Sequence, residues 1–274
     1  RADFFIVEMG AYRRGEIRAI CNIVRPRIGV ITGIGDQHLA LFGSAADLRR
    51  AKYELIDALP PDGYALVAGV DYEIREASGI VIGEADVSFT YRGERFSIPI
   101  IGKARVMNAL AAIKVAEHVG MPLRDIARAL TRIDASMLYP KLFRRADGCR
   151  AVDDTYNSSR ESFLAALEYL GVWSGYQKIV VTPGIIELGT QARRDHREIG
   201  EALKAVDAVF VTNPNFFAEL NASGNATLIR DHRAFMARLR AHATPKTIIL
   251  FEGRVHPAVV ASVTDGMHPH ASIH

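Results

Sequence analysis

The sequence of 274 residues predicts an α/β protein built from two domains. Short apolar runs alternate along most of the chain with longer segments of helical periodicity, which is the order of βαβ units and parallel sheets. Turn-forming residues separate them, as at Pro61-Asp62-Gly63. The length is sufficient for two cores of ordinary size. These observations together favour two α/β units over an all-helical or all-β fold.

The first part of the chain predicts strands and helices in strict alternation. Ser44 is well placed to cap one of the helices, because a serine hydroxyl accepts from the free amides of a first turn. The predicted elements are a strand at 3–7, a helix near 15–24, a strand at 28–32, a helix at 45–58 and a strand at 64–67.

A different pattern begins near Gly79 and continues to Ile101. Short runs alternate apolar and polar residues there, and Arg92-Gly93-Glu94 has the composition of a tight turn. We therefore expect a small antiparallel meander on the edge of the sheet. Two helices should follow, at about 105–118 and 123–133, separated by Gly120-Met121-Pro122.

Residues 134–141 have weak periodicity and are expected to form the domain linker. The βα rhythm then resumes in a Rossmann-like order. We divide the chain into a first domain at 1–138, a second at 139–265 and a tail at 266–274. The second domain should contain strands at 151–154, 178–182, 208–212, 227–229 and 247–251, and helices at 161–170, 194–206, 216–221 and 232–242.

Composition narrows the classes of partner. The net charge is only +3, with basic and acidic residues mixed along the chain, so nothing indicates a nucleic-acid partner. Cys21 and Cys149 have no metal-binding spacing and lie among apolar residues, as reduced thiols of a cytoplasmic protein do. No apolar run approaches the roughly 18 residues that a membrane-spanning helix needs.

Several motifs follow one another in a recognisable order. A carboxylate ends the first predicted strand, at the edge where α/β sheets collect ligands. In the first domain the motifs are Glu8-Met9-Gly10-Ala11, Gly15-Glu16-Ile17, the run from Ile31 to Leu39 and Ala51-Lys52. In the second they are the run from Asp153 to Asn157, Glu187-Leu188-Gly189, His196 and Gly200. In this order they resemble the central and carboxyl-terminal domains of the Mur ligase family, over nearly the whole chain.

Two features of Mur ligases are missing from this sequence. Mur ligases have a phosphate-binding G-x-x-G-K-[ST] loop before the E-M-G-A strand, and no such motif occurs in these residues. A domain for the nucleotide-sugar is likewise missing. We therefore expect this chain to be the carboxyl-terminal part of a longer ligase, inactive toward ATP by itself.

The resemblance implies an ATP-dependent amide-forming ligase. In such an enzyme ATP phosphorylates a carboxylate, and an amine then attacks the acyl phosphate. The closest motif pattern is that of the members that add D-alanyl-D-alanine to a UDP-muramyl tripeptide in peptidoglycan synthesis, so these are the expected partners. Two alternatives stay open: a Mur-like ligase for a different amino acid or peptide, and a non-catalytic binding remnant.

Three residues are implied as catalytic metal ligands. Glu8 would bind Mg²⁺, which prefers oxygen ligands, and His38 would assist a second metal site. Lys52 matches a family lysine that CO₂ carbamylates into an oxygen ligand, a reaction that requires the neutral amine. Each also has an ordinary alternative: a salt-bridging carboxylate, a loop histidine and an exposed helical cation.

ATP contacts are implied on both sides of the linker. Asn108 matches an adenine-contacting asparagine, although the preceding His-Asn pair of the family is Ala104-Arg105 here. Lys141 stands near a family arginine that grips the γ-phosphate, but without the guanidinium fork. The remaining nucleotide-binding candidates are Asp153, Asp154, Tyr156 and Asn157.

The resemblance also implies residues on the substrate side of the site. Glu187, His196 and Arg254 are the candidates for substrate binding. The family's K-G-S motif is replaced by Glu252-Gly253-Arg254, which leaves the identity of the amine acceptor open.

Overall fold

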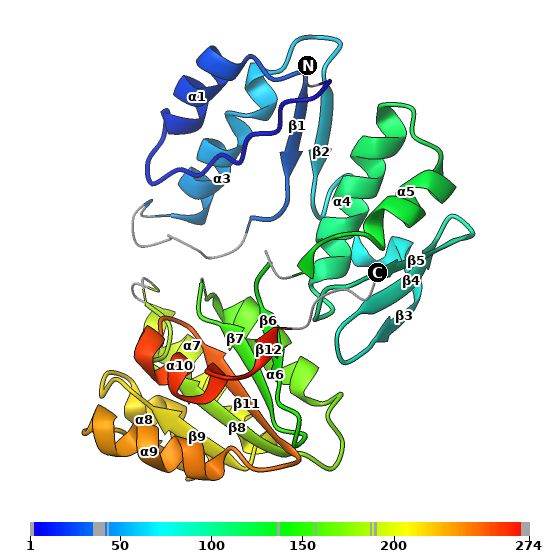
Figure 1. The fold of residues 1–274 in the computed structure, drawn as a ribbon. Coiled ribbons are helices and arrows are strands. Elements are labelled where there is room, and N and C mark those ends of the chain that lie inside the picture. The colour runs from blue at the N-terminus through cyan, green and yellow to red at the C-terminus, as the bar shows by residue number, and fades with distance from the viewer. Residues whose placement is uncertain are drawn as a thin grey trace. The chain divides into compact units, whose positions relative to one another are not determined.

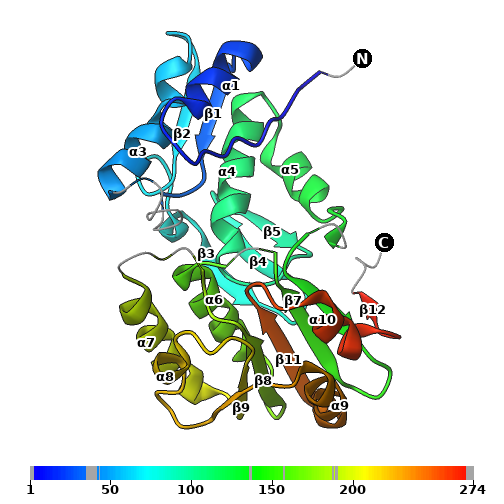
Figure 2. The same ribbon diagram turned by 90° about the vertical axis from the view of Figure 1, so that its left-hand side faces the viewer.

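A computed structural model describes residues 3–34, 42, 44–135, 138–156, 158–186, 188 and 191–269. The chain forms two compact units (Figures 1 and 2). One comprises the described residues of Arg1–Glu76, Met107–Val119 and Glu187–Thr190. The other comprises those of Ala77–Val106, Gly120–Ile186 and Gln191–His274. Each unit is described here by itself.

The first unit is built around two parallel strands, β1 (Ile28–Ile31) and β2 (Tyr64–Val67). The connection between them contains α3 (Ala45–Tyr53) and the 3₁₀ turn η1 (Ile56–Ala58), and α1 (Glu16–Val24) packs beside both (Figure 1). The helix predicted at 45–58 is thus confirmed as a helix that tightens into a 3₁₀ turn.

Side chains fix the ends of these helices. The Ser44 hydroxyl accepts from the Asp47 amide, as its capping position predicts. Glu54 accepts from the amides of Gly15 and Arg18, at 2.7 and 3.1 Å, and so satisfies the free donors at the start of α1. Helix α4 (Arg105–His118) contributes its residues from Met107 onward to this unit, where His118 stacks on Tyr64.

The strand predicted at 3–7 is wrong. These residues form irregular chain, and Phe4, Phe5 and Ile6 are exposed. A strand exists through its ladder of hydrogen bonds, and no strand among the described residues pairs with this run. An apolar composition alone is therefore not enough to make residues 3–7 a strand.

The meander is confirmed, but not its place at the edge of a larger sheet. Its strands are β3 (Ser78–Ile82), β4 (Val87–Tyr91) and β5 (Glu94–Ile98), which form a separate three-stranded sheet. Arg92 and Gly93 both have positive φ, as the two-residue turn requires. The helix α5 (Leu123–Leu130) packs against β5, so the apolar face of the meander is covered within its own unit.

The second unit has a seven-stranded sheet with the order β10-β9-β8-β11-β7-β6-β12. The five strands from the edge strand β10 to β7 are parallel, and β6 lies antiparallel to both β7 and β12. The strands are β6 (Lys141–Arg144), β7 (Arg150–Asp154), β8 (Gln177–Thr182), β9 (Ala208–Val211), β10 (Ala226–Leu228), β11 (Thr247–Glu252) and β12 (His268–Pro269).

Helices cover both faces of this sheet. On one face lie α6 (Arg160–Leu170) and α7 (Ala192–Ala202), and on the other α9 (His232–His242) and α10 (Pro257–Thr264), as Figure 2 shows. The short α8 (Phe217–Leu220) packs against α7. Every residue of the central strand β11 is buried, which explains its unbroken apolar run.

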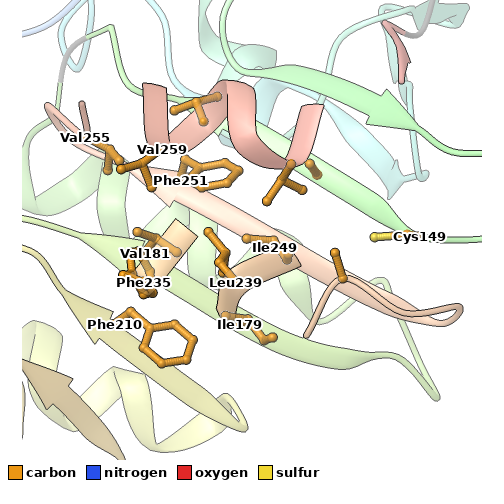
Figure 3. Close-up of a cluster of buried hydrophobic side chains, with 14 of the residues drawn as sticks. Cys149, Ile179, Val181, Phe210, Phe235, Leu239, Ile249, Phe251, Val255 and Val259 are labelled. Carbon is orange, nitrogen blue, oxygen red and sulfur yellow. The ribbon is translucent and has the colours of Figure 1, made fainter. Parts of the chain in front are cut away.

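Alternate strand residues form a core beneath α9 and α10 (Figure 3). Phe251 and Ile249 of β11 meet Phe235 and Leu239 of α9 in this cluster. Because β-strand side chains alternate between faces, Val180 and Leu250 belong to the opposite layer. The core therefore holds both faces of β11 and leaves only its ends for polar groups.

Three elements were missed by sequence reasoning. Strand β6 begins at Lys141, the last residue of the predicted linker, and was missed because its four residues carry only one buried side chain, Leu142. Helix α10 was not expected after Val255-His256-Pro257, although Pro257 stands at a favourable first helical position. In the predicted tail, His268 and Pro269 pair with β6 instead of fraying, and the residues after 269 lie outside the described ones.

The close approach of α7 and α8 can be tested by a substitution at Gly200. A Cβ on Gly200 would lie 2.1 Å from the Glu219 carbonyl oxygen, and backbone cannot swing aside as a side chain can. We predict that Gly200→Ala destabilises the second unit by about 1–3 kcal/mol, although alanine is intrinsically the better helix former. Urea unfolding followed by the fluorescence of Trp173 measures this.

Arg197→Ala, on the exposed face of the same helix, is the matched control and should shift the transition little. A Gly200→Ala protein as stable as the control would show that α7 and α8 are not held together this closely.

Candidate functional site

Polar residues gather where the central strands of the second unit end. The chain passes from β7 through α6 to β8 on one face, and it returns through α9 on the other face to place β11 between them. The reversal of direction at these strands is the switch point where open α/β sheets leave a crevice for ligands. Asp154 and Glu252 are paired in register at this edge.

The outer part of this edge presents a carboxylate, a cation and two aromatic rings. Asp153 accepts from the amide and the hydroxyl of Thr155, at 3.1 and 2.7 Å. Lys141 is paired with Asp153 in register, and its Nζ lies 4.7 Å from the centre of the Tyr139 ring. Tyr156, which is 77% exposed, stacks on Tyr139 with ring centres 5.5 Å apart.

Two carboxyl groups are buried together behind this surface. Glu252 is fully buried and Asp154 nearly so. The Ser158 hydroxyl donates to Glu252 Oε1 at 2.7 Å. Burial raises the pKa of Glu252 well above its ordinary value, and the neighbouring Asp154 raises it further. Burial likewise raises the pKa of Asp154 to about 6. The pair therefore resists carrying two charges.

Arg105 balances part of this charge. Its guanidinium lowers the pKa of Asp154, opposing the effect of burial, and it donates to the Tyr139 carbonyl at 2.7 Å. A single cation thus stabilises the carboxylate and fixes the backbone of the aromatic residue beside it. This arginine stands where the family motif has a neutral residue.

Two glycines bring the loops after β8 and β11 into contact. Gly253 has φ of 77° and a Cβ there would lie 3.0 Å from the Gly184 carbonyl oxygen. Gly184 has φ of 83° and a Cβ there would lie 2.7 Å from His196 Nε2. Only glycine fits both the conformation and the space at these positions. The loops are therefore packed backbone to backbone.

His196 is a buried support for the first of these loops. Its Nε2 accepts from the Ile185 amide at 3.0 Å, and its Nδ1 lies 2.7 Å from the Ala192 carbonyl oxygen. These partners require a neutral ring with the proton on Nδ1, and burial lowers its pKa accordingly. Phe216 stacks on the ring at 4.3 Å. Both nitrogens are used within the protein.

Two of the three candidate metal ligands lie among the described residues of the first unit. Glu8 is exposed, and within the described part of the chain no hydrogen bond or ion pair engages its carboxylate. Lys52 is half-buried and donates to the Gly33 carbonyl at 2.6 Å, and burial lowers the pKa of its amine. His38 lies outside the described residues. Those residues contain no group of three histidine, cysteine or acidic side chains arranged for a metal.

The remaining candidates are scattered. Asn108 is exposed on α4 in the first unit, and Arg254 is exposed just after β11 in the second. Asn157 and Glu187 lie outside the described residues. In the second unit the structure therefore brings together Lys141, Asp153, Asp154 and Tyr156, whereas Arg254 and His196 make no contact with that group through a described hydrogen bond or ion pair.

Four residues of this edge were not predicted. Tyr139 lies in the predicted linker, and Ser158 follows the motif that ends at Asn157. Arg105 and Glu252 had given a signal, because both replace residues that the family pattern specifies.

Two further observations bear on location and chemistry. Cys21 and Cys149 are both buried and free, as expected of reduced thiols. No helix in the described ranges is long and apolar enough to cross a bilayer.

Comparison with known proteins identifies two domains by sequence. Residues 1–85 match the family model of the Mur ligase middle domain. Residues 141–255 match that of the Mur ligase glutamate ligase domain. The second match spans the sheet edge described above.

Two curated relatives of the chain carry the same name. The UDP-N-acetylmuramoyl-tripeptide–D-alanyl-D-alanine ligase of Bacillus subtilis is 30% identical over 234 residues, covering 76% of this chain and 50% of its own. The enzyme of that name from Synechocystis is 29% identical over 272 residues, covering 91% of this chain and 60% of its own. The chain thus spans about half to three fifths of the length of these relatives.

Solved structures share the fold. MurF from Acinetobacter baumannii superposes with a TM-score of 0.81 at 24% identity, covering 94% of this chain and 64% of its own. MurF from Thermotoga maritima in complex with ADP gives 0.76 at 23% identity, covering 93% and 64%. The two α/β units and the mostly parallel sheet are therefore a shared architecture.

The buried carboxyl pair predicts a pH-dependent stability. Asp154 has an unfolded pKa of about 3.9 and a folded pKa of about 6. Between these values the unfolded chain loses a proton that the folded chain keeps, so stability falls as the pH rises from about 4 to 6. The difference between these two values corresponds to a loss of up to about 3 kcal/mol.

We predict that Asp154→Asn removes this loss, gaining stability over the wild type at pH 8 but little at pH 4. Urea unfolding at both values, with Asp265→Asn on the exposed surface as control, measures it. His196 has the opposite dependence but is present in both proteins, so it cancels. An equal effect of Asp154→Asn at both pH values would contradict the assignment.

Proposed function

The chain belongs to the Mur ligase family, and we propose on that premise that it is the central and carboxyl-terminal part of an ATP-dependent amide ligase. The proposed reaction joins D-alanyl-D-alanine to UDP-N-acetylmuramoyl-tripeptide in peptidoglycan synthesis. ATP phosphorylates the tripeptide carboxylate, the amine attacks the resulting acyl phosphate, and inorganic phosphate leaves as the amide bond forms.

The observation that carries the proposal is the sheet edge at β7 and β11. The half-buried Lys141, the buried Asp153 and the exposed Tyr156 lie together there, at the switch point of the sheet. A cation, a carboxylate and an exposed ring are suited to a phosphate, a ribose hydroxyl and a base respectively. We assign ATP to this edge, with Asp154 behind it and Asn108 and Asn157 as further proposed contacts.

The first unit supplies the proposed Mg²⁺ ligands. The exposed carboxylate of Glu8 fits a cation that prefers oxygen and retains water. The half-buried amine of Lys52, with its lowered pKa, fits the neutral form that reacts with CO₂. We propose both as ligands, with His38 as a third. Bound Mg²⁺ would neutralise phosphate oxygens during phosphoryl transfer.

Burial separates the residues proposed to bind the substrate from one that supports them. Both ring nitrogens of His196 are hydrogen-bonded to the backbone, at Ile185 and Ala192. We therefore propose that His196 positions the loop containing Ile185 and does not touch the substrate. Arg254 is exposed and available to a substrate carboxylate. Glu187 is kept as a proposed substrate contact.

The domain division and location belong to the same proposal. We place the boundary near residue 139, so that the nucleotide contacts are divided between both domains. Domain closure would then complete the site. A cytoplasmic location suits the two free thiols and the precursor substrates.

One alternative has a specific observation in its favour. Glu252 introduces a buried carboxyl where the family motif has lysine, beside the residues that face the ligand edge. A changed charge at that position favours a ligase of the same chemistry with another amine substrate. Amine specificity in the assay below decides between them.

The test is ATP-dependent phosphate release by the complete parent protein with UDP-muramyl tripeptide and D-alanyl-D-alanine. We predict that release needs both substrates and that Glu8→Ala lowers it by roughly a hundredfold or more, because a metal ligand stabilises several kcal/mol of developing charge. Asp57→Ala, an exposed carboxylate of the same unit, is the control and should keep wild-type turnover.

Release that occurs only with another amine would retain the ligase and reject the dipeptide. Release that ignores both substrates, or a Glu8→Ala rate within about twofold of the control, would reject the proposed reaction or the metal role. Absence of turnover with every amine would favour a binding remnant.

A further inference from the structure

Glu252 lies between Ser158 and Asp154. Its ionised carboxylate can accept a hydrogen bond from Ser158 but has no proton to donate to Asp154. Ser158 Oγ donates to its Oε1 at 2.7 Å. Its other oxygen, Oε2, meets no N–H or hydroxyl donor within the described ranges, and the side chain is fully buried. A buried carboxylate oxygen without a donor is costly. A proton on Oε2 removes the cost by making that oxygen a donor.

Asp154 is the acceptor for this proton. The two residues are register partners on adjacent parallel strands, and the charge of Asp154 raises the pKa of Glu252. Two negative charges at this depth would repel each other with little solvent to screen them. One proton shared between them satisfies both groups.

The surrounding charges decide which group keeps the proton. Arg105 from the start of α4 acts on Asp154, and Asp153 is the other charged neighbour of that residue. Glu252 is buried more deeply, and its only charged neighbour is Asp154 within the part of the chain described. The single negative charge therefore belongs on Asp154, beside the guanidinium, and the proton belongs on Glu252.

We propose that Glu252 is a protonated positioning residue that accepts from Ser158, donates to Asp154 and thereby holds the segment bearing Tyr156 against β11. Described residues on both sides of Tyr156 are held by hydrogen bonds: Thr155 bonds to Asp153, and Ser158 bonds to Glu252. Tyr156 lies between these ties with its ring exposed. Glu252 thus acts on the ligand edge without touching the ligand.

Of the two parts of this proposal, only one rests on the proposed function. The protonation of Glu252 and the tether stand on this structure alone. The expected effect on nucleotide affinity rests on the proposed function, and the measurements are chosen to separate the two.

The first measurement is carboxyl ¹³C NMR of the 274-residue chain labelled at glutamate side chains. Loss of one resonance in Glu252→Gln assigns the Glu252 signal. We predict that this signal has the chemical shift of a protonated acid at pH 7 and that it is separated from the signal of Glu201, which is exposed on α7. An ionised Glu252 at pH 7 overturns the proposal.

The second measurement is hydrogen exchange of the Thr155 and Tyr156 amides. Glu252→Gln retains both a donor and an acceptor, so exchange should stay within about twofold of wild type. Glu252→Lys can donate to Asp154 but cannot accept from Ser158, and Ser158→Ala removes the donor. Both should accelerate exchange on the order of tenfold, the equivalent of one hydrogen bond.

Ser158→Ala keeps the test decisive if Glu252→Lys does not fold, and Glu201→Gln controls for removal of an exposed charge. Unchanged exchange in Ser158→Ala overturns the tether.

Calorimetric titration with ADP and Mg²⁺ tests the effect on the ligand. Binding that Ser158→Ala weakens by about tenfold supports the positioning role, and equal binding by both proteins overturns it. If the wild-type chain fails to bind ADP, the assignment of ATP to this edge fails instead, while the NMR and exchange results decide the tether.

Discussion

Burial of the central strand β11 on both faces is the constraint on which the second unit depends. All six of its residues are enclosed by helices, so its side chains supply the core and its polar groups can emerge only where the strand ends. Glu252 is the last of those residues. Its carboxyl is forced into contact with Asp154 of the neighbouring strand, and the protonation of this pair sets the charge of the whole edge.

The two departures from the family pattern at this edge act on the same pair. Glu252 adds a buried acid, and Arg105 supplies a guanidinium that favours the ionised form of Asp154. Arg105 also holds the Tyr139 backbone, and Tyr139 stacks on Tyr156. The replacements are therefore linked through one network and leave a single negative charge behind an intact aromatic and cationic surface.

Sequence periodicity predicted most of this architecture. The helices at 105–118 and 232–242 and the strand at 64–67 have the predicted bounds, because each carries its own buried face. It failed where order depends on partners distant in sequence: residues 3–7 have no pairing strand among the described residues, and β6 gains its place only by pairing with β7. The site divides in the same way. Motifs located Asp153, Asp154 and Tyr156, whereas the roles of Glu252 and His196 follow from burial and hydrogen-bond partners that spacing does not reveal.

The most direct test of this account is the map of amide chemical-shift changes when ADP and Mg²⁺ are added to the 274-residue chain. The account predicts that the largest changes within the second unit lie at Lys141, Asp153 and Tyr156, at the ends of β6 and β7. Changes confined to the opposite edge, or distributed without preference over the second unit, would contradict it. Either result would mean that the polar edge of β7 and β11 serves the fold and not the nucleotide.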